Sequence, residues 1–474
     1  MTTESETRIT EILKKQREFF RSGKTLSPAY RIDCLKRLRE TLLRRESEIA
    51  GALKEDLGKC RQEAYMTEIG MVLSELSCAK AGLRKWARPR RAQPPLALFP
   101  SRCRIIPEPY GNVLIISPWN YPFLLCVAPL VSAVAAGNTA VLKPSEHSPA
   151  TSAVIRSIMQ EVFPEELVTV IEGDAEMTAG LLERKFDYIF FTGGSAVGRI
   201  VMEKAAVHLT PVTLELGGKC PVIVDRTADP EVSAARIIFG KCLNCGQTCV
   251  APDYVMVHED IADAFVEACR RQVRKMCGDS PLDDPDYGKI VSRRHFDRIS
   301  AMLDECTGGS HECTIFGGRR DADSLKIEPT IIRLGRMTDE KNMGLRIMTE
   351  EIFGPLLPVL TYGDIEDVIR QVDGNPKPLA AYVFTRDAGT KNDILRRLRF
   401  GGGCVNDTVM HLVTESLPFG GTGESGMGNY HGKYGFDTFS HLKSIVERPL
   451  FPDPPMRYRP YTALKEKLVR IFMR

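Results

Sequence analysis

Between residues 112 and 218 the chain alternates short apolar runs with longer segments of helical character. The apolar runs are NVLIIS (112–117), NTAVLKPS (138–145), LVTVIEG (167–173), FDYIFFTG (186–193) and PVTLELGG (211–218). Helical segments are expected between them, at 123–138, 148–163, 175–183 and 195–209. Apolar strands that alternate with helices are typical of a parallel sheet covered on both faces. The sequence therefore predicts a doubly wound α/β domain whose ligand lies at the carboxyl ends of the strands.

The same rhythm returns after residue 220. CPVIVD (220–225) and DYVMVH (253–258) have the character of strands, and 231–244 and 261–276 that of helices. A chain of 474 residues is too long for one core, so we expect a second α/β domain here. Between Trp86 and Tyr110 the chain is rich in proline and arginine. That composition leaves an extended linker and an oligomerisation arm equally open.

Composition and charge exclude several classes of protein. A net charge of +3 gives no reason to expect a nucleic-acid partner. The N-terminus is polar and lacks the apolar stretch of a signal peptide, and the 14 cysteines are irregularly spaced. We therefore expect reduced thiols and a cytoplasmic location. The uncharged segment from Gly111 to Leu142 is interrupted by SPWNYP (117–122), so it is too short to span a membrane.

Three cysteines lie within eight residues of the segment KCLNCGQTCVAPDY (241–254). They are Cys242, Cys245 and Cys249. A closed metal site needs four ligands, and the nearest further candidate, His258, lies beyond a predicted strand, so no metal is expected. Sulfur chemistry alone leaves two interpretations open, namely buried inert thiols or one nucleophile with two neighbours.

The segment GTGESG (421–426) matches the dinucleotide-binding fingerprint in its letters alone. No apolar strand precedes it, and MGNYHGKYG (427–435) has too many glycines for us to expect a helix after it. We therefore interpret 421–435 as a loop.

Seven motifs occur in the order found in the aldehyde dehydrogenase superfamily. They are SPWNYP, VLKPSE, FFTGGSAVG, TLELGGK, NCGQTC, EEIFGP and LPFGGTGESGMG. The chain resembles this family from about residue 10 to about 450, and its short N-terminus and MGNYHGK…FDTFSH segment are most similar to the class 3 branch, which acts on fatty and aromatic aldehydes. The resemblance implies a Rossmann-like cofactor domain and a catalytic domain, both doubly wound, with a small β oligomerisation arm.

The resemblance also implies boundaries for these parts. The NAD(P)-binding domain would comprise 1–86 and 110–217, and the catalytic domain 218–417. The arm would comprise 87–109 and 418–450, followed by a C-terminal tail at 451–474.

The resemblance assigns the catalytic roles residue by residue. Cys249 is the expected nucleophile, and Cys242 and Cys245 occupy positions without a catalytic thiol in the family. Asn120 is expected to stabilise the oxyanion of the cysteine adduct together with a backbone N–H group. Glu215 is expected to activate the water that hydrolyses the thioester. A redox-free cysteine acyl-transferase or hydrolase, and a CoA-acylating aldehyde dehydrogenase, are the alternatives.

The family's cofactor contacts transfer to a further set of residues. They are Trp119, Lys143, Glu146, Gly193, Gly194, Ser195, Ala196, Val197, Gly198, Glu351 and Phe353. Glu146 near the adenosine ribose would repel a 2′-phosphate, so we expect NAD, with NADP as the alternative. Gly194 stands where class 3 relatives usually carry asparagine. The resemblance leaves long-chain and aromatic aldehydes both open as substrates.

Two further expectations concern assembly. Segments 87–110 and 435–447 are expected to form a strand-rich flap in a homodimer. The tail at 463–474 places Leu464, Leu468, Ile471 and Phe472 on one face among basic residues. We expect it to pack against the body of the protein, the alternative being weak contact with an anionic membrane surface.

Overall fold

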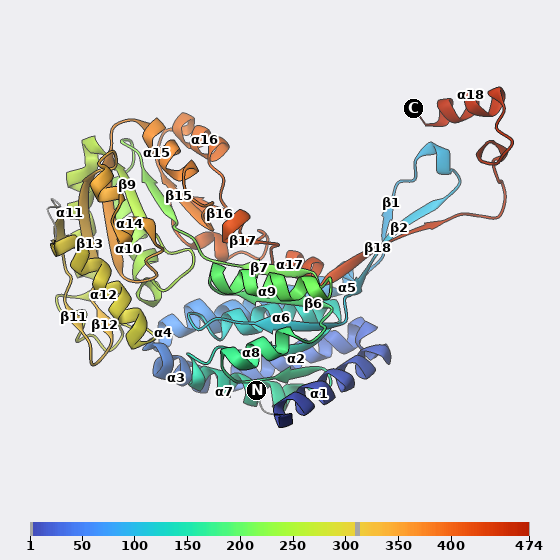
Figure 1. The fold of residues 1–474 in the computed structure, drawn as a ribbon, viewed down its shortest axis with the longest axis horizontal. Coiled ribbons are helices and arrows are strands. Elements are labelled where there is room, and N and C mark those ends of the chain that lie inside the picture. Colours follow the sequence, from blue (N-terminus) through green and yellow to red (C-terminus); the bar gives the residue numbers. More distant parts are fainter. Residues whose placement is uncertain (1–2, 309–312, 474) are drawn as a thin grey trace.

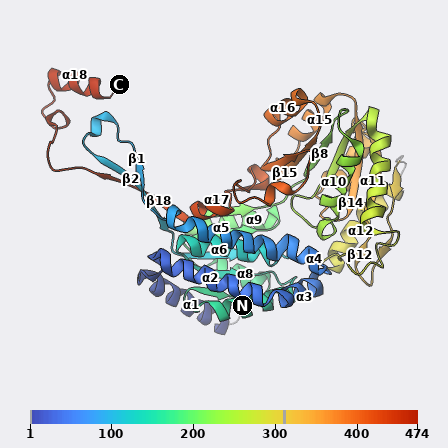
Figure 2. The same ribbon diagram turned by 180° about the vertical axis from the view of Figure 1, so that it is seen from behind.

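The computed structural model describes residues 3–308 and 313–473. A layer of helices begins the chain and lies along the bottom of the molecule in Figure 2. Its elements are α1 (Thr3–Arg21), α2 (Pro28–Arg44), α3 (Glu46–Leu57), α4 (Arg61–Ala64), the π-helical turn η2 (Tyr65–Ile69) and α5 (Gly70–Trp86). This layer packs onto the first sheet domain and reaches the loops that carry the site.

The first sheet has six strands in the order β17-β7-β6-β3-β4-β5. Five run parallel, and β17 is antiparallel at one edge. The strands are β3 (Asn112–Ile116), β4 (Thr139–Lys143), β5 (Val168–Val170), β6 (Tyr188–Thr192), β7 (Val212–Glu215) and β17 (Gly426–Met427). The helices between them are α6 (Leu124–Ala136), α7 (Pro149–Val162), α8 (Ala175–Leu182) and α9 (Ser195–Val207).

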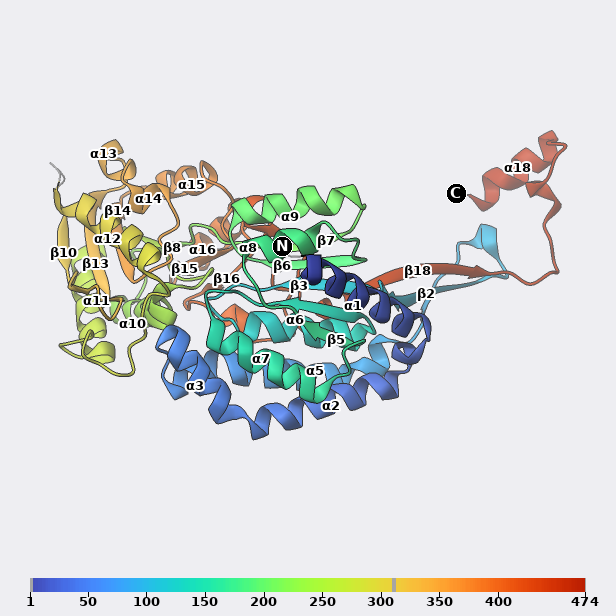
Figure 3. The same cartoon turned by 60° about the horizontal axis from the view of Figure 1, so that its bottom comes forward.

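Both faces of this sheet are buried. Val113 and Ile115 of β3 pack with α6 and α7, whereas Leu114 and Ile116 pack with α1, α8 and α9. Figure 3 shows α9 on one side of the sheet and α6 and α7 on the other. Because successive strand residues point to opposite faces, a strand buried on both faces has to be apolar throughout. The doubly wound domain predicted from the apolar runs is confirmed.

The second sheet has seven strands in the order β10-β13-β14-β9-β8-β15-β16. All pairs are parallel except β10 with β13. The strands are β8 (Pro221–Val224), β9 (Tyr254–His258), β10 (Thr314–Phe316), β13 (Thr330–Arg336), β14 (Leu356–Tyr362), β15 (Ala380–Phe384) and β16 (Gly402–Val405). The helices around them are α10 (Pro230–Cys242), α11 (Ala262–Cys277), α12 (Arg293–Gly308), α13 (Glu340–Met343), α14 (Arg346–Thr349), α15 (Ile365–Asp373) and α16 (Ala388–Arg397). A two-stranded hairpin, β11 (Arg320–Asp321) and β12 (Lys326–Ile327), lies beside them.

A three-stranded antiparallel arm projects from the body (Figure 1). It consists of β1 (Arg90–Ala92), β2 (Arg102–Pro109) and β18 (Ser440–Glu447). Ser440 pairs with Pro109 near the body, and Glu447 pairs with Arg102 at the far end. The chain therefore leaves β18 at the tip of the arm.

The expectation that the tail packs on the body is wrong. Helix α18 (Ala463–Phe472) lies at the tip of the arm, against the short turns η3 (Leu96–Leu98) and η8 (Pro455–Arg457). The physical reason is the direction of β18, which delivers the tail to the tip and not to the body. Leu464 and Ile471 stay 69% and 58% exposed. No helix in the described ranges is both long enough and apolar enough to cross a bilayer.

The interpretation of 421–435 as a loop holds only for its first part. Residues 421–426 form a turn that ends in β17, but helix α17 begins at Gly432 and runs to Thr438. The strand expected over 435–447 accordingly starts at Ser440. A Cβ atom on Gly435 would lie 2.2 Å from Ser132 Oγ of α6, so this glycine permits close helix packing. Tertiary packing here outweighs the low helix propensity of glycine.

Candidate active site

A cleft of about 290 Å³ opens where the first sheet faces the second. Its walls include Thr192 and Glu215, the last residues of β6 and β7, and the loop after β3. Cys249, from the loop between α10 and β9, closes it from the other side. The structure thus places the site at the carboxyl ends of the parallel strands, as expected for a doubly wound sheet.

An unusual backbone conformation presents Cys249. Three consecutive residues before it, Asn244, Cys245 and Gly246, have φ values of 49°, 53° and 74°. Left-handed conformations are costly for cysteine and cost little for glycine. At Gly246 a side chain is also excluded by space, because a Cβ atom would lie 2.2 Å from Gly354 O. Such stored strain persists only where surrounding contacts fix the loop.

Gln247 supplies those contacts. Its side chain is fully buried, and its Nε2 donates to Asn244 O and Lys289 O at 3.0 Å each. Its Oε1 accepts from Val291 N at 3.0 Å. The glutamine two residues before the cysteine therefore ties the loop to a neighbouring segment.

The surroundings of Cys249 disfavour the thiolate form of its side chain. Burial raises its pKa to about 12, and the nearby charges of Glu351 and Glu215 add to the effect, while the backbone N–H groups of Cys249 and Val250 oppose it. A thiolate is the reactive form, so activation needs a positive charge or a proton acceptor beside the sulfur.

The other two cysteines of the motif lie in the core. Cys245 is 2% exposed and packs with Tyr254 and Tyr287. Cys242 shares a hydrogen bond with Cys277, and this bond together with burial raises the pKa of the Cys242 thiol. Neither thiol lines the cleft, which suits the packing role expected for them.

Glu215 is buried without compensation. Its side chain is 2% exposed, and neither carboxylate oxygen has a hydrogen-bond partner among the described residues. Burial accordingly raises its pKa well above the ordinary value. Buried polar groups are nearly always hydrogen-bonded, so an unpartnered carboxyl facing a cleft needs a functional explanation.

Asn120 lies in the loop between β3 and α6 and is 4% exposed. Its Nδ2 donates to Gln247 O at 3.1 Å, which joins this loop to the cysteine loop. An amide nitrogen carries two hydrogens, so a second remains for another acceptor. Asn120 and Cys249 line the same cleft.

Five of the predicted cofactor residues line the cleft. They are Trp119, Gly193, Gly194, Glu351 and Phe353. The rings of Trp119 and Phe353 meet edge to face, with centroids 5.4 Å apart. Burial raises the pKa of Glu351 to about 7, with the charge of Asp253 adding, and Gly218 N donates to its Oε1 at 3.2 Å.

The remaining six do not line the cleft. Lys143 ends β4 beside Ile116 of β3, and its Nζ lies 3.6 Å from Glu146 Oε2. Residues 195–198 form the first turn of α9, which Gly194 caps. A Cβ atom on Gly198 would lie 2.7 Å from Leu216 Cδ2, so that glycine serves close packing between helix and strand. These residues lie at the same edge of the sheet as the cleft.

Sequence reasoning missed two residues of α12 that line the cleft. The ring of His295 lies 5.1 Å from that of Trp119, and burial lowers the His295 pKa to about 4, so the ring is neutral at neutral pH. Arg298 donates to the carbonyl oxygens of Glu351 (3.1 Å) and Ile352 (2.5 Å). His295 and Arg298 are three residues apart near the start of a helix, so they lie on the same helix face, and this spacing was the signal in the sequence.

Sequence reasoning also missed an apolar cavity of about 110 Å³. It shares Cys249, Leu125, Phe419 and Tyr430 with the cleft. Its other walls are Met66, Thr67, Met71, Tyr121, Leu124, Phe239, Leu243, Thr248, Val409, Met410, Leu412, Val413 and His431. These residues come from segments far apart in the chain, so no local motif could have revealed them. Cys249 thus lines both the cleft, together with Glu215 and Asn120, and the apolar cavity, an arrangement that suits a cysteine nucleophile between two ligand sites.

Comparison with known proteins assigns the family. Residues 1–445 match the model of the aldehyde dehydrogenase family. The chain is 44% identical to 4,4'-diaponeurosporen-aldehyde dehydrogenase of Staphylococcus aureus, over 96% of this chain and 97% of the relative. It is 42% identical to aldehyde dehydrogenase family 3 member H1 of Arabidopsis thaliana, over 97% and 93%. A solved structure described as the substrate-bound state of Staphylococcus aureus AldH superposes with a TM-score of 0.94 at 43% identity, covering 98% of this chain and 99% of that one.

The chain belongs to the aldehyde dehydrogenase family. The resemblance inferred from seven motifs is thereby confirmed, including its class 3 character, since its relatives include family 3 members. The protein is an aldehyde dehydrogenase that depends on a nicotinamide cofactor.

Proposed function

We propose that the protein oxidises aldehydes with an apolar chain or ring to carboxylic acids through an adduct on Cys249, with NAD as the preferred cofactor. One observation supports this above the others. Cys249 is shared by the cleft and the apolar cavity, and the carboxyl of Glu215, which has no partner among the described residues, lies in the same cleft.

Features of the cleft and of the adjacent start of α9 support binding of a dinucleotide. Gly194, the N-cap of α9, leaves the first N–H groups of that helix available for a phosphate, and a Cβ atom there would meet nothing within 4 Å. Trp119 and Phe353 supply an aromatic wall for a planar ring. When bound, the cofactor supplies the acceptor for the hydride and a positive charge that lowers the pKa of the nearby thiol. Glu146 near the adenosine ribose would repel a 2′-phosphate and so favour NAD, and its ion pair with Lys143 weakens that preference.

Cys249 would attack as the thiolate after its proton passes to solvent; a C–S bond forms to the aldehyde carbon, the C=O π bond breaks, and its electrons leave an oxyanion. Two donors would stabilise that oxygen, the free hydrogen of Asn120 Nδ2 and the backbone N–H of Cys249. Both are held in the folded loops before substrate arrives, so little reorganisation accompanies the reaction.

After oxidation the adduct is a thioester, and Glu215 would activate the water that hydrolyses it. The buried carboxyl has a raised pKa, so its ionised form is a stronger base than an exposed glutamate. Water attack releases the carboxylic acid and returns the proton to Cys249.

The apolar cavity supports the proposed substrate class. Its lining is mainly aliphatic and aromatic, so chain or ring carbons gain by leaving water there. An aldehyde panel assayed at 340 nm with NAD and NADP in parallel tests this proposal, and rates should rise with apolar size. No NADH would instead indicate redox-free acyl transfer, and acyl-CoA formation would indicate the CoA-acylating alternative.

We further propose that the arm joins two copies into a homodimer. Strand β18 lies at the edge of the arm sheet and exposes Leu442 and Val446, which are 42% and 54% exposed. The exposed Leu464 and Ile471 of α18, among basic side chains, support weak contact of the tail with an anionic membrane surface. The 14 free cysteines suit a reducing, cytoplasmic location.

A further inference from the structure

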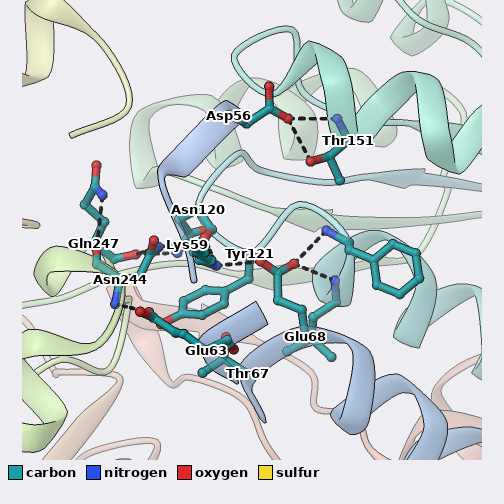
Figure 4. A network of polar contacts seen from close by, with 12 residues as sticks. Asp56, Lys59, Glu63, Thr67, Glu68, Asn120, Tyr121, Thr151, Asn244 and Gln247 are labelled. Carbon is teal, nitrogen blue, oxygen red and sulfur yellow. Dashed lines mark hydrogen bonds and ion pairs between the residues drawn. The ribbon is translucent and has the colours of Figure 1, made fainter. Parts of the chain in front are cut away.

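A fully buried ion pair lies beneath the loop that carries Asn120. Lys59 and Glu68 are both 0% exposed, and Lys59 Nζ lies 2.5 Å from Glu68 Oε1 (Figure 4). Lys59 follows α3, and Glu68 belongs to the π-helical turn η2. Neither residue lines the cleft or the apolar cavity.

Both residues of the ion pair also form hydrogen bonds with the loop that carries Asn120. Lys59 Nζ donates to Asn120 O at 3.0 Å. Glu68 Oε2 accepts from Phe123 N at 2.9 Å and from Leu124 N at 3.1 Å, where α6 begins. A carboxylate at a helix start is stabilised by the unpaired N–H groups and the helix dipole. The ion pair therefore fixes both ends of the segment from Asn120 to Leu124.

The same region holds the cysteine loop. Asn244 Nδ2 donates to Asn120 O at 2.7 Å, so this oxygen accepts from both sides. Glu63 Oε1 accepts from Asn244 N at 2.6 Å, and Tyr121 Oη shares a hydrogen bond of 2.6 Å with Thr248 Oγ1. Lys59 Nζ also lies 3.9 Å from the centre of the Tyr121 ring. Figure 4 shows Lys59, Glu63, Tyr121 and Asn244 converging between the two loops.

The local backbone indicates that this arrangement is not a packing accident. A π-helical turn is rare and is found frequently at functional sites. Here it lets Glu68 point into the core while Met66 and Thr67 of the same turn line the apolar cavity. A buried ion pair is also a poor source of stability, because desolvation offsets the attraction between the charges. The function of this ion pair is therefore better explained by the residues that it positions.

We propose that Lys59 and Glu68 are positioning residues that hold the Asn120 amide in register with Cys249. The proposal rests on the oxyanion role proposed for Asn120. Removing the ion pair keeps the Asn120 amide group but removes the contacts that fix its backbone, so the amide can shift. A misplacement of about 1 Å by a remote mutation costs on the order of 10²-fold in rate.

The test measures the burst of NADH with saturating cofactor and an apolar aldehyde. Lys59→Met should slow the burst by about 10²-fold, with the KM for cofactor unchanged, because the cofactor contacts are untouched. Glu68→Gln, which keeps an oxygen for the α6 N–H groups, should slow it less. Lys59→Met destabilises the fold because it leaves the Glu68 carboxylate buried without its partner. The double variant Lys59→Met with Glu68→Leu replaces both charges by apolar groups and should therefore keep the fold.

Asp56→Asn is the matched control. Asp56 belongs to the same helical layer and caps α7, accepting from Ala150 N (3.2 Å) and Thr151 N (2.8 Å). It is another buried carboxylate at a helix start, but it does not contact the Asn120 loop. This variant should lower the melting temperature and leave the burst rate unchanged.

A double-mutant cycle separates positioning from general damage. If Lys59 acts through Asn120, Lys59→Met should change the burst little once Asn120→Ala is present. Two results would overturn the positioning role. One is that the rate reductions of Lys59→Met and Asn120→Ala multiply when both changes are combined. The other is a normal burst rate in both Lys59→Met and the apolar variant Lys59→Met with Glu68→Leu. If Asn120→Ala alone leaves the burst intact, the proposed oxyanion role fails instead, and the two failures are thus distinguishable.

Discussion

Replacing Glu215 with Gln tests the proposed division of labour between Cys249 and its neighbours. Glutamine keeps the size of the side chain and removes the base. Both carboxylate oxygens lack partners among the described residues, so the change breaks no hydrogen bond there and the fold should persist. Addition of the thiol and oxidation of the adduct should still occur, whereas hydrolysis of the thioester should stall.

The expected result is one rapid burst of NADH, close to one equivalent per site, followed by a slow steady rate. General-base catalysis by a positioned group contributes about 10²–10⁴-fold, so the steady rate should fall by that factor. Rapid mixing at 340 nm measures both phases. Acid quench and intact mass should then detect the acyl group on Cys249. A folded variant that binds cofactor but shows neither burst nor adduct would refute the role of Glu215.

The pH dependence gives an independent check with a definite sign. Burial raises the Glu215 pKa, and only the ionised form is a base. The wild-type steady rate should therefore fall as pH drops through that raised pKa, and the Gln variant should lack this limb. Because the folded pKa exceeds the unfolded one, Glu215 favours folding at low pH and loses this contribution as pH rises. The melting temperature of the variant should accordingly fall less with rising pH.

Three other predictions concern the thiols, the arm and the tail. Cys249→Ala should abolish NADH formation, whereas Cys242→Ala and Cys245→Ala should keep most of it and lose stability, as thermal melts would show; equal loss in all three would contradict a single nucleophile. Light scattering at micromolar concentration should give a dimer, and a monomer would contradict an interface formed by the arm. Deleting 463–474 should reduce binding to anionic liposomes and spare activity, and unchanged binding would rule out membrane contact by the tail.

The sheets were predictable because each of their buried strands is a short apolar run of consecutive residues. Strands buried on both faces must be apolar throughout, so β3, β4 and β6 are visible as runs in the sequence. Glu215 stood out for the same reason, being a charged residue at the end of such a run.

What the sequence concealed depends on contacts between distant segments. Helix α17 forms because Gly435 fits against Ser132, a neighbour known only after folding. His295 lies beside the ring of Trp119, and Lys59 beside the carbonyl of Asn120, only because distant segments pack together. The position of the tail follows from the direction of β18, and the sequence of the tail contains no pattern that predicts this direction.

The two cavities that meet at Cys249 have largely separate walls, and this separation has an evolutionary consequence. Residues such as Met66, Phe239 and Val413 line only the apolar cavity, so under the proposed function their replacement should alter the substrate range and leave the cleft proposed for the cofactor unchanged. The shared residues, among them Phe419 and Tyr430, line both cavities, so their replacement should affect both proposed ligand sites. Lineages of such enzymes can therefore diversify through one wall, and an inhibitor that fills the apolar side should discriminate between relatives that share an unchanged cofactor half.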